Sequence, residues 1–137
     1  MSNQNKLIID AGTCITYDFV NAENQYLGGA ISPGIKIRYK SLNNYTSKLP
    51  LLTLSEDFEI IGNSTKSAIH SGVINGVIFE IEGFISQYSL KNQDLTIILT
   101  GGDAEFLAKR LKSTIFANSN FLLESLNLLS LYTQKND

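Results

Sequence analysis

The sequence predicts a mixed α/β fold, in which a β-sheet and helices pack as layers. Three β-rich segments follow one another early in the chain, separated by short polar turns. A long stretch with helical periodicity comes next, and the continuous apolar run LTIIL beyond it is typical of a buried strand. The predicted order is three strands, two helices, a strand and a helix, then an ambiguous segment and a final helix.

The three early strands are predicted at residues 7–9, 14–20 and 26–32. Apolar side chains alternate in the second of them, so that Ile15, Tyr17 and Phe19 share one face. Because the connecting turns are short, these strands are expected to form an antiparallel meander.

A helix is predicted from about Gly34 to Tyr45. Pro33 just before it suits the first helical position, and Ser32 is available as the N-cap. The segment 48–58 contains a proline and has no clear period, so it is interpreted as a connection.

A second, longer helical pattern opens at Gly62-Asn63-Ser64-Thr65 and runs to about Tyr88. Its interior contains Gly72, Gly76 and Gly83, and each glycine weakens an isolated helix by roughly 1 kcal/mol relative to alanine. We expect another backbone to approach these glycines closely, from a neighbouring element or from a second subunit.

The last third begins with a buried strand at 95–99 and a glycine turn, after which Asp103 could cap a helix. Residues 113–121 are ambiguous, and residues 122–132 have the pattern of a final helix. The 137 residues are expected to form a single domain, residues 1–137.

Composition limits the class of partner. A net charge of -2 and a pI near 5.3 give no electrostatic reason to expect nucleic acid or an anionic membrane. No uninterrupted apolar stretch approaches the roughly 18 residues of a membrane helix, so a cytoplasmic location is expected. The single cysteine, Cys14, cannot form an internal disulfide and is interpreted as a small buried thiol. One cysteine and one histidine exclude the usual zinc frameworks.

The first candidate for chemistry is Asp10-x-Gly12-Thr13, at the end of an apolar strand. Gly12 lets a ligand approach closely, and Thr13 offers a hydroxyl and a backbone N–H to a phosphate oxygen. A carboxylate beside a phosphate requires a cation between them, or must accept a proton. The alternative is a plain hairpin turn, in which these residue types are common.

A second candidate, Thr100-Gly101-Gly102-Asp103, joins a buried strand to a helix. Such a turn allows a base or ribose to approach, and a helix N-terminus favours an anion. The alternative is an ordinary strand-to-helix turn with Asp103 as its cap.

Two weaker candidates remain. The segment Gly28–Gly34 could line a pocket, or form a bulge followed by a helix. The hydroxyls around Thr65 could grip a polar substrate or simply cap the helix, and His70 on that helix is interpreted as structural.

Taken together, these motifs resemble one ribonuclease H-like lobe of the actin-like ATPases, the superfamily that includes sugar kinases. The segments IDAGTCITYDF, YLGGAISPGI, NSTKSAIHSGV, LTGGDA and LESLNLL are similar, in order and approximate spacing, to the carboxy-terminal lobe of type III pantothenate kinases. The resemblance covers nearly the whole chain.

The resemblance implies a function in the first step of coenzyme A biosynthesis, the ATP-dependent phosphorylation of pantothenate to 4'-phosphopantothenate. It implies ATP with magnesium, a monovalent cation (potassium or ammonium) and a homodimer with substrate near the subunit interface. The residues it assigns are Gly12, Thr13, Gly101 and Gly102 to ATP, Thr65 to pantothenate, and Asp10 to the monovalent cation.

The chain also departs from that family. Family members carry an amino-terminal Asp-x-Gly-Asn-Thr phosphate loop and a Gly-x-Asp-Arg segment with the general base, and neither occurs here. We therefore expect a fragment or one half of a split enzyme, with no catalytic base and little activity alone. The missing amino-terminal lobe would then be a partner. The alternative is a non-catalytic nucleotide-binding or interaction lobe of another actin-like small-molecule kinase.

Overall fold

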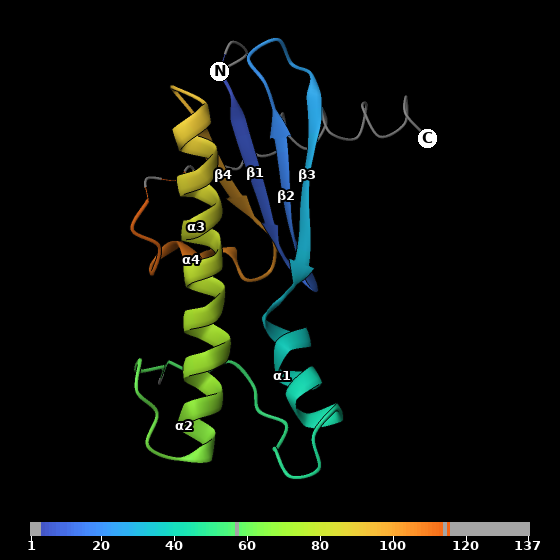
Figure 1. Ribbon diagram of the computed structural model, residues 1–137, viewed down its shortest axis with the longest axis vertical. Coiled ribbons are helices and arrows are strands. Elements are labelled where there is room, and N and C mark those ends of the chain that lie inside the picture. The colour runs from blue at the N-terminus through green and yellow to red at the C-terminus, as the bar shows by residue number, and fades with distance from the viewer. Residues whose placement is uncertain (1–3, 57, 114, 116–137) are drawn as a thin grey trace.

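The computed structural model describes residues 4–56, 58–113 and 115, and it confirms the mixed α/β fold. A four-stranded sheet with the order β3-β2-β1-β4 packs against a long helical rod (Figure 1). The strands are β1 (Lys6–Ala11), β2 (Cys14–Val20), β3 (Tyr26–Pro33) and β4 (Thr96–Thr100). The helices are α1 (Ile35–Asn44), α2 (Thr65–His70), α3 (Gly76–Lys91) and α4 (Ala104–Ala108).

The sheet contains both kinds of strand pairing. The strands β1, β2 and β3 form the predicted antiparallel meander, whereas β4 pairs with β1 in parallel. In this register Asp10 lies opposite Thr16 on one side and Thr100 on the other. Parallel strands end at the same edge, so the last residues of β1 and β4 come together there.

A β-bulge interrupts the pairing of β2 with β3. Phe19 pairs with Gly28 and Val20 with Tyr26, so Leu27 has no partner in the register. Gly28 takes φ +107°, which side-chain-bearing residues rarely adopt. The bulge interpretation of this glycine segment is therefore confirmed.

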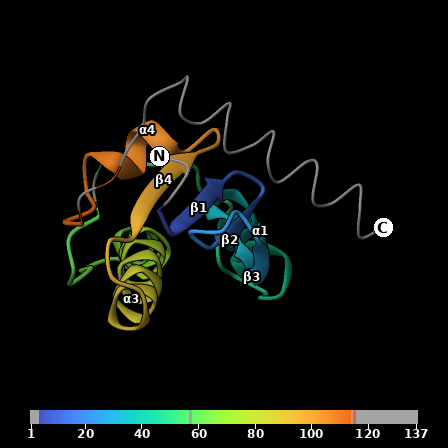
Figure 2. The ribbon, with the colours of Figure 1, turned by 90° about the horizontal axis from the view of Figure 1, so that it is seen from above.

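One rod covers a face of the sheet. The segment consists of α2, a π-helical turn at Ser71–Asn75 and α3, and in the view from above it is seen nearly end-on beside the sheet (Figure 2). The periodic apolar residues of the predicted long helix form the buried side of this rod. The buried side chains of the rod that join the main core are Ile69, Val73, Ile74, Val77, Ile81 and Ile85, and those of the sheet include Leu7, Ile9, Ile15, Tyr17, Ile97 and Leu99.

The π-helical turn holds the loop that precedes the rod. The Ser71 hydroxyl donates to the Ile60 carbonyl at 2.7 Å, and the Asn75 amide donates to the Phe58 carbonyl at 2.7 Å. A single π-helical turn re-aims side chains within an otherwise regular helix. Here it turns two polar groups toward the loop.

The glycines of the rod have a different environment from the one we expected. A Cβ added at Gly72 or Gly83 would meet nothing within 4 Å, and at Gly76 it would meet only the Arg38 side chain at 3.8 Å. No neighbouring backbone within the described residues accounts for them. The interpretation based on a neighbouring element therefore fails for the part of the chain that the structure describes, and a second subunit remains a prediction.

The start of α1 also differs from the prediction. Pro33 is the last residue of β3 and pairs with Cys14, while Gly34 occupies the N-cap position. Ser32 lies in the strand and does not cap the helix; its hydroxyl donates to Glu80 at 2.6 Å. The strand is longer than expected because its ladder with β2 continues through Pro33.

Cys14 is exposed, so its interpretation as a buried thiol is wrong. Side chains alternate along β2, and Cys14 lies on the face opposite to Ile15 and Tyr17, at the exposed start of the strand. The predicted helix at 122–132 and all but two residues of the ambiguous segment 113–121 lie outside the described residues.

The rod Thr65–Lys91 meets the length and composition required of a membrane-crossing helix, with 39% of its most apolar window buried. The same test is passed by core helices of proteins that do not enter membranes. Its buried side belongs to the main core.

Replacing Ile81 with alanine should destabilise the fold by about 2–5 kcal/mol, because this fully buried side chain would leave a cavity between rod and sheet. Urea unfolding of Ile81→Ala would measure the loss. Leu90→Ala on the same helix is the control, since Leu90 is 78% exposed and its loss should change stability little. Equal losses for the two variants would contradict this packing.

Glu82 should make stability depend on pH. Burial alone would raise its pKa, but hydrogen bonds from Ser113 and from the Lys112 backbone outweigh burial and hold the pKa below the ordinary value. A carboxylate whose pKa is lower in the folded than in the unfolded protein stabilises the fold at pH values above its unfolded-state pKa. This stabilisation is lost as the pH falls through the folded-state pKa. The stability gap between wild type and Glu82→Gln should therefore narrow as pH falls from about 6 to about 3. Urea titrations in which this stability difference widens as the pH falls would contradict the lowered pKa of Glu82.

Candidate nucleotide site

The carboxyl ends of β1 and β4 carry the first two sequence motifs, and the fold brings them together. The Asp10 side chain is exposed and lies between two glycine turns. Its Oδ1 atom is 3.9 Å from the position of a Cβ at Gly12 and 2.6 Å from that of a Cβ at Gly101. The carboxylate thus borders both the β1–β2 turn and the turn after β4.

The two turns are also hydrogen-bonded to each other. The Asp103 backbone N–H donates to the Ala11 carbonyl at 3.0 Å. Gly101 takes φ +102°, and a Cβ there would lie 2.5 Å from that carbonyl. A glycine is required at this position both by its backbone conformation and by the close approach of β1.

The β1–β2 turn is closed on its other side by the start of α1. The Gly34 N–H donates to the Thr13 carbonyl at 2.9 Å, and Gly12 N–H donates to Cys14 carbonyl at 3.0 Å. A Cβ at Gly34 would overlap the Gly12 and Thr13 carbonyls, so this close contact needs glycine. Thr13 itself remains exposed at the surface, where a ligand can reach it.

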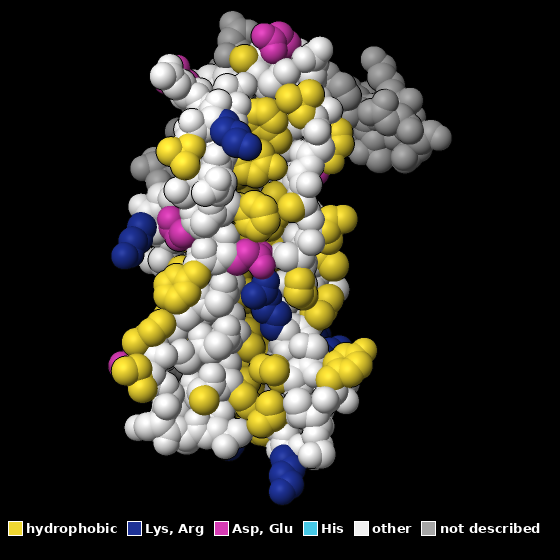
Figure 3. All heavy atoms as spheres, viewed as in Figure 1, with side chains coloured by type: hydrophobic (Ala, Val, Ile, Leu, Met, Phe, Trp, Pro, Cys, Tyr) yellow, Lys and Arg dark blue, Asp and Glu magenta, His cyan; other side chains and the backbone are white. Residues whose placement is uncertain are grey.

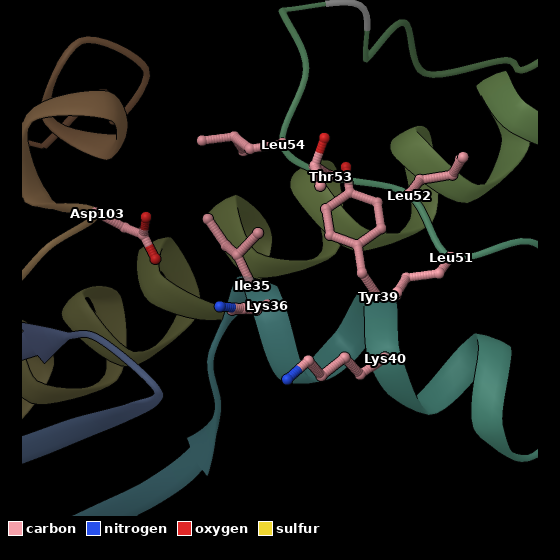
Figure 4. A pocket seen from close by; sticks show the side chains of 9 residues that line it. All are labelled: Ile35, Lys36, Tyr39, Lys40, Leu51, Leu52, Thr53, Leu54 and Asp103. Atoms are coloured by element: carbon pink, nitrogen blue, oxygen red, sulfur yellow. The ribbon is translucent and has the colours of Figure 1, made fainter.

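A pocket of about 240 Å³ opens beside these turns, between α1, the following loop and Asp103. Figure 4 shows Asp103 on one side and Leu51 on the other, with Ile35 and Tyr39 between them. The pocket lining is mainly apolar, with two lysines from the exposed side of α1. The lining residues are Ile35, Lys36, Tyr39, Lys40, Leu51, Leu52, Thr53, Leu54 and Asp103.

Asp103 faces this pocket. It occupies the N-cap position of α4, but its side chain makes no capping hydrogen bond, so the predicted capping role is wrong. Burial raises the pKa of its carboxyl group above the ordinary value. The α4 turn is held by Gly101 instead, whose carbonyl accepts from the Ala104 N–H at 3.1 Å.

Tyr39 connects the pocket to the rod. Its hydroxyl lies 2.7 Å from His70 Nδ1, and the two rings meet edge to face with centroids 5.5 Å apart. Burial raises the pKa of this hydroxyl to about 12. His70 therefore anchors α1 to α2, which agrees with its interpretation as a structural residue.

Thr65 lies apart from the other predicted site residues. It is exposed at the first position of α2, at the end of the rod away from the sheet (Figure 1). The helix start is capped by Ser64, whose hydroxyl accepts from the Ser67 N–H at 3.1 Å, while the Ser67 hydroxyl accepts from the Ser64 N–H. Capping therefore occupies Ser64 and Ser67 and leaves Thr65 at the surface.

Sequence reasoning found Asp10, Gly12, Thr13, Gly101 and Gly102, and the fold places all five around one edge of the sheet. It did not find the pocket. Lys36 and Lys40 belong to a short basic cluster that gives no sign of a pocket, and the segment Leu51–Leu54 has no periodicity that would mark it.

The sequence model of the type III pantothenate kinase family matches residues 1–87, well over half of the chain. The chain belongs to the type III pantothenate kinase family. The matched region contains β1–β3, α1, α2 and most of α3, and therefore the whole β1–β2 turn and Thr65.

Relatives in this family extend the match to nearly the full chain. The type III pantothenate kinase of Flavobacterium johnsoniae is 63% identical over 134 residues, which are 98% of this chain and 55% of that relative. That of Flavobacterium psychrophilum is 66% identical over 129 residues, 94% of this chain and 54% of the relative. The chain thus spans about half the length of the curated relatives it matches.

A solved structure supports the fold. A Campylobacter jejuni protein described as a Baf family transcriptional activator superposes with a TM-score of 0.62 at 23% identity. The superposition covers 96% of this chain and 60% of that one. At this identity the likeness concerns architecture only.

Replacing Gly101 with alanine should destabilise the fold by more than about 1 kcal/mol, because alanine is strained at this positive φ and its Cβ would collide with Ala11. Gly102→Ala is a matched control one residue away, since a Cβ there meets nothing within 4 Å. Thermal unfolding of both variants measures the difference. A Gly101→Ala protein as stable as Gly102→Ala would contradict the close approach.

Proposed function

We propose that this chain forms the nucleotide-binding wall of an enzyme that phosphorylates pantothenate with ATP. The observation that carries the proposal is the meeting of Asp10, the β1–β2 turn and the Gly101-Gly102 turn at one edge of the sheet. Ligands of α/β proteins bind outside the carboxyl ends of parallel strands. Membership of the family supplies the substrate, pantothenate, and the donor, ATP.

The phosphates would lie at the β1–β2 turn. Thr13 is exposed there and offers a hydroxyl, and Gly34 at the start of α1 packs directly against the carbonyls of Gly12 and Thr13. Phosphoryl transfer depends mainly on positioning and on stabilising negative charge. Gly12 and Thr13 are suited to positioning, while a cation must supply the charge.

The adenosine part of ATP would lie in the pocket beside Asp103. Its apolar lining from Ile35, Leu52 and Leu54 suits the face of a base. Asp103 can accept a hydrogen bond from a ribose hydroxyl, and Lys36 adds positive charge on the pocket side of α1. Gly101 and Gly102 directly precede Asp103 in the chain and would leave room for the sugar beside it.

Asp10 would hold the monovalent cation, potassium or ammonium. Within the described residues its carboxylate forms no salt bridge, and no group of three or more metal-ligating side chains surrounds it. A single carboxylate beside a phosphate site suits a cation shared with the nucleotide. Magnesium would enter bound to ATP, and the bound cations would offset phosphate charge.

Thr65 would contact pantothenate, and a homodimer would bring it to a nucleotide site. It lies at the far end of the rod from the sheet (Figure 1). The outer side of the rod carries Phe79, which is 61% exposed, beside open surface at Gly72 and Gly83. A second copy packed on this side would explain glycines that no described backbone approaches.

The general base and the amino-terminal phosphate loop of the family would come from a separate amino-terminal lobe. ATP is a substrate found inside cells, so we place the enzyme in the cytoplasm. The alternative function, a non-catalytic nucleotide-binding lobe, predicts the same ATP binding but no contribution to turnover when the other lobe is supplied.

ATP should bind this chain, and Lys36→Glu should weaken the affinity about tenfold, which corresponds to about 1.4 kcal/mol. The reversed charge would repel the phosphates. Isothermal titration calorimetry with magnesium and potassium present measures both. Lys48→Glu is the matched control, an exposed lysine that does not line the pocket, and its affinity should equal that of wild type. No heat of ATP binding to wild type would overturn the proposed nucleotide site.

The chain alone, given ATP, pantothenate, magnesium and potassium, should form little or no phosphopantothenate. Both walls of a kinase cleft are needed to align the donor and the acceptor. A coupled ADP-release assay, with product confirmed by mass spectrometry, measures this. Robust turnover that Asp10→Asn abolishes would contradict the requirement for a second lobe.

A further inference from the structure

Glu80 of α3 lies outside the candidate nucleotide site, and its carboxylate accepts hydrogen bonds from three different elements. It accepts hydrogen bonds at 2.6 Å from the Tyr17 hydroxyl of β2, the Ser32 hydroxyl of β3 and the Arg38 guanidinium of α1. In Figure 3 an acidic and a basic side chain touch midway along a strip of apolar side chains. The Arg38 and Glu80 side chains are only 20% and 22% exposed.

The electrostatics favour a charged Glu80. Burial alone would raise its pKa, but the hydrogen bonds from Ser32, Tyr17 and Arg38, with the positive charge of Arg38, lower it below the ordinary value. Burial and the bond to Glu80 raise the pKa of the Tyr17 hydroxyl well above its usual range. The tyrosine therefore stays a proton donor and Glu80 an acceptor. Charge-assisted bonds of this kind are short and resist displacement.

Arg38 connects Glu80 to the β1–β2 turn, where the phosphates are proposed to bind. Besides its bond to Glu80, its Nε donates to the Pro33 carbonyl at 2.9 Å. The next residue is Gly34, whose N–H donates to the Thr13 carbonyl. A continuous series of contacts therefore runs from the rod through one arginine to the β1–β2 turn.

We propose that Glu80 is a positioning residue for the phosphate side of the site. Through Arg38 it fixes the start of α1, and thereby the β1–β2 turn at Thr13, relative to the rod. The expected effect of Glu80 on ATP affinity rests on the proposed function, whereas its effect on the position of the β1–β2 turn does not. Small displacements of a binding group are costly in affinity, even when they arise away from the ligand.

The same helix provides a matched control. Glu82 also accepts hydrogen bonds from several donors, but these come from Lys112 and Ser113. In the part of the chain that the structure describes, neither residue forms a hydrogen bond with the β1–β2 turn. Glu82→Gln should therefore lower stability without moving the turn.

The experiment compares Glu80→Gln with Glu82→Gln in the full chain, together with Arg38→Lys. Two-dimensional NMR of ¹⁵N-labelled protein reports the amides of Gly12, Thr13 and Gly34, while thermal unfolding and ATP calorimetry are measured on the same samples. We expect Glu80→Gln and Arg38→Lys to shift those three amides and to weaken ATP about tenfold. Arg38→Lys keeps the charge but loses the planar fork that bonds Glu80 through one nitrogen and Pro33 through another. Glu82→Gln should leave the amides and the affinity unchanged.

The readouts separate the possible failures. Unmoved turn amides in Glu80→Gln would overturn the positioning role, whether or not ATP binds. Equal shifts in Glu80→Gln and Glu82→Gln would also overturn it, because general loosening would then explain both. If wild type binds no ATP but the amides move only in Glu80→Gln and Arg38→Lys, the proposed function fails and the positioning role stands.

Discussion

The parallel pairing of β1 with β4 is the constraint on which the rest of the structure depends. Two parallel strands cannot be joined by a tight turn, so the chain must cross the sheet between them. Here the crossing contains α1 and the long rod, and the rod supplies the apolar side that buries the sheet. The same pairing brings the carboxyl ends of both strands to one edge, where Asp10 meets the turn at Gly101.

The rod therefore has two kinds of contact with different consequences. Its isoleucine and valine side chains pack on the sheet and provide most of the burial. Its polar groups are fewer and act locally: Glu80 reaches α1 and His70 reaches Tyr39. Both polar contacts end on the helix that closes the β1–β2 turn and lines the pocket. Burial of the sheet and the polar contacts to α1 thus come from different side chains of one rod.

Much of the architecture could be predicted because it is encoded by local patterns. Alternation placed Ile15 and Tyr17 on the buried face, and the periodicity of the rod was visible despite its glycines. The errors arose where a local rule was outweighed by pairing. Pro33 has the preferences of a helix start, but the β2–β3 ladder extends through it. Cys14 has the character of a buried residue, but its place in the alternation turns it outward.

The sequence by itself determined the order of the described elements, the buried face of β2 and the two glycine turns, because these follow from the spacing of apolar residues and from backbone preferences. The tertiary structure alone decided that Asp10 adjoins Gly101, that a pocket opens beside Asp103 and that Glu80 binds Arg38. These partners are far apart in the chain. Their contact depends on strand register and helix rotation, which no local pattern of residues specifies.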